Sequence, residues 1–259
     1  MSSTHGLPLD DKDILILIVG STGAGKSFFI NALLQQQDRM PVGRGLTACT
    51  TEIDYACLKT SELELYPHLK AYRIILVDTP GFNDCDKDDT QILDNIIQEL
   101  KEPPKRKARL GGIIYLHDIM VSRFDGGSQQ NLQMLQKLCG TSRLNNVILA
   151  TTKWGRKKQH SEDLHNQLIA KYWKALLEKG ARVRRFDADF RSAWDVIDPV
   201  ISTIAQQLSQ DTFFGMELGG YDAERGPAVR GDDKKRRNAL QNFWPFKGLF
   251  KRGRGTACI

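Results

Sequence analysis

The feature that most constrains this chain is the run GSTGAGKS at residues 20–27, which matches the pattern GxxxxGK[ST] at each fixed position. It lies between an aliphatic stretch at 14–19 and a helical pattern at 26–34, the context that this pattern requires. Glycines let such a loop wrap tightly, so that backbone N–H groups point at phosphate oxygens. Lys26 would then neutralise β- and γ-phosphates, and Ser27 would ligate Mg²⁺. A glycine-rich turn with a surface lysine is the competing interpretation.

Apolar runs bounded by turn residues alternate with helical patterns along the chain, which predicts βα units and a mostly parallel sheet. The expected fold class is α/β, a doubly wound, six-stranded P-loop nucleotide-binding domain. Ligands of such sheets lie beyond the carboxyl ends of the strands. Strands are expected at 14–19, 53–58, 73–77, 112–116, 147–150 and 182–186, and helices at 26–34, 90–100, 128–138, 162–179 and 193–208.

The 259 residues, 41% of them hydrophobic, suit one sizeable domain with sequence left over. We expect an N-terminal arm at 1–12, the nucleotide-binding domain at 13–212, a linker at 213–233 and a tail at 234–259. The tail holds eight basic residues and no acidic one, so the net charge of +6 leaves −2 for residues 1–233. The basic character therefore belongs to the tail, and the domain is not expected to bind nucleic acid.

A second phosphate-site element is the sequence DTPG at 78–81, directly after a predicted strand. Asp78 is placed to hold Mg²⁺ through water, and the N–H of Gly81 is placed to contact the γ-phosphate. When that phosphate leaves, the segment after Gly81 is free to move. Taken alone, DTPG is also compatible with an ordinary turn at the end of a strand.

Together the two elements resemble the translation-factor-related class of GTPases, and more narrowly the group that contains septins and the immunity-associated and chloroplast-import GTPases. The runs DTPGFNDCDKDDTQIL, GGIIYLHDIMVSRFDGGSQQNLQMLQKLCG and GARVRRFD look like those of uncharacterised single-domain fungal members. The similarity covers residues 13–208 and says nothing about the tail. It implies a G domain, GTP and GDP as ligands, Mg²⁺ as cofactor and a nucleotide switch.

The resemblance also implies a threonine on Mg²⁺ between the first helix and the second strand. Thr47, Thr50 and Thr51 are the candidates. Thr50 and then Thr51 are favoured, because both lie immediately before the strand; threonines that merely begin a strand are the alternative. The expected metal ligands are Ser27, Thr50 and Asp78, and the expected catalytic residues are Lys26, Thr50 and Gly81. The nucleotide-binding residues are expected to be Gly20, Ser21, Thr22, Gly23, Ala24, Gly25, Lys26, Ser27, Phe28, Asp78, Gly81, Thr152 and Lys153.

The resemblance places the base-reading motif [NT]KxD after the fifth strand. Thr152 and Lys153 fit it, but Gly155 stands at the aspartate position. The motif therefore leaves guanine selectivity open, with GTP favoured over ATP. Asp187, after the last strand, is a candidate substitute carboxylate, and an exposed residue or a helix cap is its alternative interpretation.

Hydrolysis requires an oriented water, and the position after the switch glycine is Phe82, whose ring orients none. Slow intrinsic turnover is expected unless His117, Arg123, a homodimer partner across the nucleotide face or an activating protein completes the site. A nucleotide-holding assembly module with little hydrolysis and an ATP-preferring enzyme are the alternatives. A P-loop kinase fits less well, because the acidic segment 84–89 looks like a mobile switch.

The tail interleaves cations with Phe243, Trp244 and Phe250, a pattern typical of segments that contact anionic membranes. A solubilising tail and a KKRR nuclear-import patch compete with this interpretation. Prenylation is not expected, because Thr256 stands where a CaaX box has cysteine; Cys258 is at most a palmitoylation site. Five scattered cysteines and no secretory signal predict a cytoplasmic protein, and the tail adds the expected peripheral membrane contact.

Overall fold

The computed structural model describes residues 9–36, 39–42, 53–81, 98, 108–121, 126–139, 144–155, 158–210 and 213. The chain divides into two units, Met1–Gly220 and Tyr221–Ile259, and all of these residues belong to the first. Several predictions fall outside them: Thr47, Thr50, Thr51, Phe82, Arg123, the segment 84–89, most of the helix at 90–100, and the tail at 234–259.

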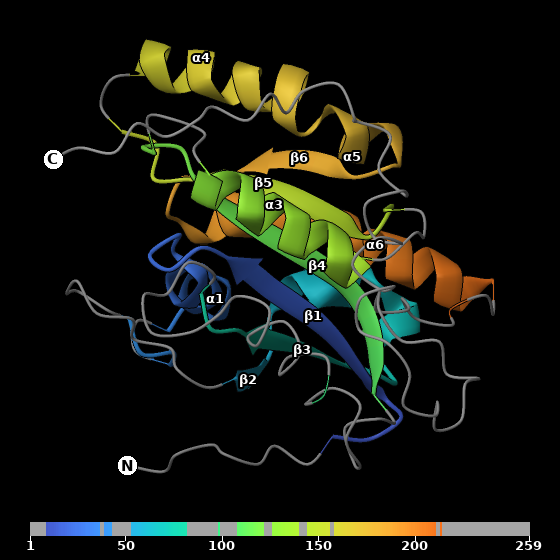
Figure 1. Ribbon diagram of the computed structural model, residues 1–259. Coiled ribbons are helices and arrows are strands. Elements are labelled where there is room, and N and C mark those ends of the chain that lie inside the picture. The colour runs from blue at the N-terminus through green and yellow to red at the C-terminus, as the bar shows by residue number, and fades with distance from the viewer. Residues whose placement is uncertain are drawn as a thin grey trace, which may run out of the picture. The chain divides into compact units, whose positions relative to one another are not determined.

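The domain is built on one six-stranded sheet in the order β2-β3-β1-β4-β5-β6 (Figure 1). All neighbouring strands are parallel except β2, which runs antiparallel to β3. This architecture confirms the predicted α/β fold. The strands are β1 (Asp13–Gly20), β2 (Asp54–Cys57), β3 (Arg73–Asp78), β4 (Arg109–Asp118), β5 (Val147–Thr152) and β6 (Arg182–Arg185).

Among the predicted helices that the structure describes, one differs from its prediction. The helix expected at 162–179 is divided, because a hydrogen bond of 2.7 Å from Trp173 N to Leu168 O widens one turn, and Trp173 is completely buried there. Two 3₁₀ segments between β2 and β3 were not predicted. The elements are α1 (Lys26–Leu34), η1 (Ser61–Leu65), η2 (Pro67–Leu69), α3 (Gly126–Cys139), α4 (Lys158–Gln167), the π-helical turn η4 (Leu168–Tyr172), α5 (Lys174–Glu178) and α6 (Phe190–Ser209).

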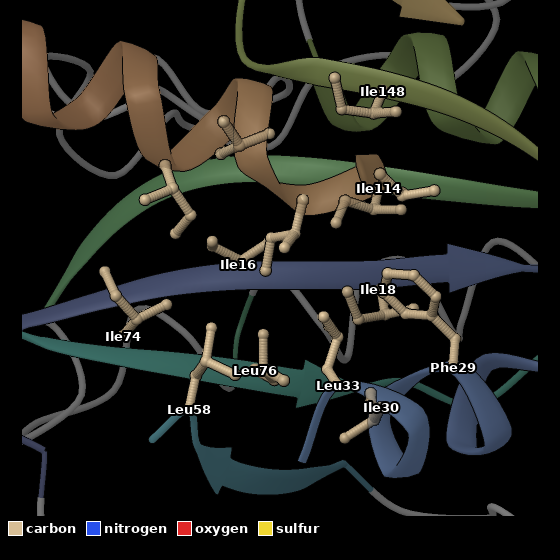
Figure 2. Packing of buried hydrophobic residues seen from close by; sticks show 14 of the residues in the cluster. Ile16, Ile18, Phe29, Ile30, Leu33, Leu58, Ile74, Leu76, Ile114 and Ile148 are labelled. Carbon is tan, nitrogen blue, oxygen red and sulfur yellow. The ribbon is translucent and has the colours of Figure 1, made fainter. Parts of the chain in front are cut away.

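Alternate residues of β1 belong to two separate hydrophobic cores, because successive side chains of a strand point to opposite faces of the sheet. Leu15 and Leu17 belong to the core that also contains buried residues of α3, η4 and α5. Ile16 and Ile18 belong to the opposite core, with buried residues of α1 and α6. Figure 2 shows them among side chains of β3, β4, β5 and α1. Because both faces are covered, only the edges and ends of the sheet remain for ligands.

Two consecutive glycines at the start of β4 let α6 lie directly on the strand backbone. A Cβ on Gly111 would lie 2.5 Å from Ile14 Cγ2 and 2.7 Å from Ile204 Cδ1. A Cβ on Gly112 would lie 2.5 Å from Val200 Cγ1. A larger residue at either position would therefore force neighbouring atoms to shift, and at Gly112 these include the Asn146 carbonyl oxygen at 2.8 Å.

The core extends slightly beyond the predicted domain limits. Leu9, in the expected N-terminal arm, is buried, and so is Phe213, the first residue of the expected linker. The guanidinium of Arg109 donates to the Phe213 carbonyl at 3.1 Å. No helix within the described parts of the chain is long and apolar enough to span a membrane.

Candidate nucleotide site

Three glycines shape the loop between β1 and α1 (Figure 1). Gly20, Gly23 and Gly25 have φ values of 150°, 79° and 94°, which other residues rarely adopt. A Cβ on Gly20 would also lie 2.4 Å from the Leu116 carbonyl oxygen of β4. The chain therefore turns sharply enough for the first amides of α1 to face the end of the sheet, where an anion binds favourably.

The ammonium group of Lys26 is held inside this loop. The residue is only 6% exposed, and Nζ donates hydrogen bonds to the carbonyls of Gly20 at 3.2 Å and Ser21 at 3.1 Å. A buried cation requires such partners. The loop therefore carries a fixed positive charge at its centre, where the sequence predicts that the phosphates bind.

Ser27 and Asp78 form the second part of the site. Ser27 Oγ donates to Asp78 Oδ2 at 2.6 Å, and Asp78 is 1% exposed at the end of β3. A hydroxyl and a carboxylate are the hard oxygen donors that Mg²⁺ prefers, and Mg²⁺ usually takes only one or two protein ligands beside waters and phosphates. The two residues therefore fit the predicted metal.

The DTPG segment contacts the phosphate loop directly. Thr79 Oγ1 donates to the Ile18 carbonyl of β1 at 2.9 Å, and Thr79 is completely buried. A Cβ on Gly81 would lie 2.5 Å from both N and Cα of Thr22. The backbones of Gly81 and the phosphate loop are thus in contact, an approach that only glycine permits at this position.

The loop after β5 is joined to the phosphate loop through Thr152. Its Oγ1 donates to the Ala24 carbonyl at 2.8 Å and approaches the His117 carbonyl at 3.4 Å. Lys153 has a φ of 59° and its Nζ pairs with Asp118 Oδ2 at 2.8 Å. Sequence reasoning missed Asp118, which occupies the end of β4 beside Thr152 of β5.

Trp154 is held between groups from two other elements. The Arg185 guanidinium carbon, from β6, lies 4.3 Å from the Trp154 ring centroid. The ring centroid of His165, from α4, lies 5.3 Å from the same point. Arg185 also pairs with Glu162, which lowers the pKa of that carboxyl. Burial lowers the pKa of His165, whose Nδ1 lies 3.1 Å from Thr151 Oγ1. These contacts hold Trp154 in the loop after β5.

The His117 side chain packs against two aromatic rings. Its ring stacks on Tyr115 and meets Trp173 edge-on, with 5.9 Å between the centroids of His117 and Trp173, and the residue is 6% exposed. Its side chain faces the core beneath α5. This placement favours the structural interpretation over a role in hydrolysis.

Asp187 is exposed, and the cap of α6 is a different residue, Asp189. The Asp189 carboxylate accepts from Ser192 N at 2.7 Å, and this hydrogen bond lowers the pKa of Asp189. Asp187 contributes only its backbone N–H, which donates to Ser192 Oγ at 3.0 Å. Phe28, the remaining predicted contact residue, is 43% exposed in the first turn of α1, with its ring centroid 6.0 Å from that of Phe186.

The sequence family decides the class of the domain. A family model described as 50S ribosome-binding GTPase matches residues 15–163, more than half of the 259 residues. The chain belongs to this GTPase family. The match spans the phosphate loop, the DTPG segment and the base-reading loop of the GTPase domain, so the predicted P-loop GTPase class is confirmed.

Solved structures show the same fold at low sequence identity. Toc33 from Arabidopsis thaliana in complex with Mg²⁺ and GMPPNP is 14% identical with a TM-score of 0.55, covering 81% of this chain and 88% of Toc33. The complex of Toc33 with GDP and Mg²⁺ gives a TM-score of 0.53, at 14% identity and with 80% and 88% covered. The bacterial selenocysteine-specific elongation factor EF-Sec is 18% identical with a TM-score of 0.51, covering 74% of this chain and 29% of EF-Sec. A search of curated proteins gave no match. The narrower resemblance to septins and fungal proteins stays a prediction.

Proposed function

We propose that this GTPase-family protein is a GTP-binding switch with Mg²⁺-dependent and slow intrinsic hydrolysis. The observation that carries the proposal is the hydrogen bond from Ser27 to Asp78, because it joins the phosphate loop to the end of β3 where both groups can serve one metal ion. The solved Toc33 complexes with Mg²⁺ and GMPPNP or GDP support the choice of ligand.

Each part of the site has a chemical role in this proposal. The loop amides and Lys26 bind the β- and γ-phosphates, while Ser27 and Asp78 hold Mg²⁺. When bound, Mg²⁺ supplies charge neutralisation between the phosphates. Gly81 offers its N–H to the γ-phosphate, and its backbone contact with Thr22 lets a change at the phosphate alter the DTPG segment. Thr50 would complete the metal ligands.

Slow turnover follows from the residue after Gly81. Phe82 has no group that orients an attacking water, and His117 is packed in the core. A partner that supplies the missing group is therefore part of the proposal, in the form of a homodimer across the nucleotide face or an activating protein. Dimerization is important for the GTPase activity of the chloroplast translocon components atToc33 and psToc159, which supports testing the homodimer first.

The decisive experiment is a titration of the purified protein with GTP, GDP, ATP and ADP, with and without Mg²⁺, followed by single-turnover hydrolysis at rising protein concentration. The proposal predicts Mg²⁺-dependent GTP binding and slow hydrolysis that accelerates as the protein dimerises. Tight nucleotide binding without hydrolysis at any concentration would favour the nucleotide-holding module instead. Preference for ATP would favour the ATP-dependent alternative.

We also propose peripheral contact between the tail and anionic membranes. Residues 234–259 carry eight cations, no acidic residue, and several bulky aromatics. Aromatic groups enter the headgroup region while basic residues are attracted to anionic lipids. This proposal rests on sequence and is independent of the nucleotide site.

A further inference from the structure

The space beside Gly155 is bordered by a thioether. Gly155 does not have a positive φ, so its backbone conformation suits other residues as well. Among the residues that the structure describes, a Cβ on Gly155 would meet only Met120 within 4 Å, with 3.1 Å to Sδ and 3.6 Å to Cε. Met120 is 56% exposed, so its side chain is able to move aside. Glycine is therefore not a backbone requirement here, and Met120 borders the place where the motif has an aspartate side chain.

Asp118 fixes the positions of both Met120 and Lys153. Its Oδ1 accepts a hydrogen bond from Met120 N at 2.8 Å, and its Oδ2 pairs with Lys153 Nζ at 2.8 Å. The nearby carboxylate thus has both oxygens engaged with protein donors. It holds the thioether and the loop after β5 together, and its charge is already paired with the Lys153 ammonium.

We infer that Met120 lines the base subsite and that this site accepts a purine ring without reading its 2-amino group. The inference rests on the proposed nucleotide binding. Guanine offers N–H donors at N1 and N2, which a carboxylate would accept, whereas a thioether is only a weak acceptor. A polarisable thioether does, however, give favourable contact to the face or edge of an aromatic ring. Exposed apolar area at Met120 is consistent with a surface that a bound base covers.

The direct test compares GTP with ITP, whose base lacks only the 2-amino group, in equilibrium binding to the full chain with Mg²⁺. The two dissociation constants are expected to agree within about threefold, since no buried carboxylate is left unpaired by ITP. A tenfold or greater preference for GTP would overturn the inference, and Asp187→Ala would show whether that carboxylate reads the base. If neither nucleotide binds, the proposed function fails, which is a distinguishable result.

Substitutions locate the effect. Gly155→Asp is expected to introduce a preference for GTP over ITP of at least about tenfold, because it supplies the missing acceptor. A folded Gly155→Asp protein that still treats the two nucleotides alike would contradict the inference.

Met120→Ala is expected to weaken GTP and ITP equally, roughly three- to tenfold, through lost apolar contact. Inorganic tripolyphosphate, which has no base, should bind Met120→Ala as it binds the wild type. The matched control is Val121→Ala, the adjacent exposed apolar residue, for which no change is expected. Equal weakening of tripolyphosphate by Met120→Ala, at an unchanged melting temperature, would show that Met120 does not contact the base.

Discussion

Ser27 Oγ donates a hydrogen bond of 2.6 Å to Asp78 Oδ2, joining two residues that are 51 positions apart in sequence. One belongs to the first turn of α1 and the other ends β3, which pairs with β1. The parallel pairing of β1 and β3 brings their carboxyl ends to the same edge of the sheet, so the two oxygen donors are close together before any ligand binds.

Ser27→Asn should reduce the Mg²⁺-dependent part of GTP affinity preferentially, because it removes the hydroxyl ligand and its bond to Asp78. Titration with and without Mg²⁺ separates that part, and a loss of about tenfold or more is expected only when Mg²⁺ is present. Ser61→Asn, at an exposed serine in η1, is the matched control. An equal loss in both titrations would exclude a metal role for Ser27.

Lys26→Ala should abolish measurable triphosphate binding, with a loss of about two orders of magnitude or more, because the ammonium is the fixed positive charge inside the loop. Lys70→Ala removes an exposed lysine and should leave binding unchanged. Isothermal titration with GTP, together with a melting curve for each variant, makes the measurement. A folded Lys26→Ala protein with wild-type affinity would mean that the phosphates bind elsewhere.

Gly81→Ala should weaken GTP binding and lower the melting temperature, because the added Cβ would lie 2.5 Å from backbone atoms of Thr22. Thr22→Ala should not rescue Gly81→Ala, since the conflict is with backbone. Rescue by Thr22→Ala would show that the close approach of the two backbones is not what requires glycine.

The capping box at the start of α6 should make stability depend on pH in the acid range. The Ser192 N–H lowers the pKa of Asp189 below its usual 3.8, so its stabilising effect is present above that value and is lost as pH falls through the folded-state pKa. Asp189→Ala should therefore lower the melting temperature by a few degrees at pH 7. The difference from wild type should shrink towards pH 3. Asp187→Ala, two residues earlier, is the control and should have no such effect.

The full chain should co-sediment with vesicles that contain phosphatidylserine and not with uncharged vesicles, because the tail combines cations and aromatics. Truncation after Asp233 should remove binding. Changing Phe243, Trp244 and Phe250 to Ala should weaken it while leaving the charge unchanged. If binding survives truncation or ignores the aromatic changes, the membrane mechanism is wrong; a nuclear-import patch would need only the charge.

The proximity of the phosphate loop and the DTPG segment could be predicted, because each is a short, contiguous motif at the carboxyl end of a predicted strand. The four central strands β1, β3, β4 and β5 were recognisable from aliphatic runs that are buried on both faces, whereas the edge strands β2 and β6 are only partly buried. The division of the predicted helix at Leu168–Tyr172 was not recognisable, because one extra residue in a turn follows from the burial of Trp173 and leaves little trace in the helical period.

The base subsite was harder to predict for a different reason. Asp118 and Met120 meet the loop after β5 only because Asp118 pairs in register with Thr152, a relationship that no local pattern contains. His117 was considered for hydrolysis because it lies near the end of a strand. Tyr115, two residues earlier on the same face of that strand, is buried in the core. Strand alternation places His117 on that face as well.

The direct contact between α6 and the two glycines of β4 has a consequence for the order of events during protein synthesis. The phosphate-binding residues are all translated before residue 82, but the core beneath α1 stays open until α6 covers it. Because α6 ends at Ser209, the ribosome must synthesise nearly the whole domain before α6 can pack against the sheet. A nascent chain that already carries every residue of the phosphate loop is thus expected to become competent for nucleotide only late in translation.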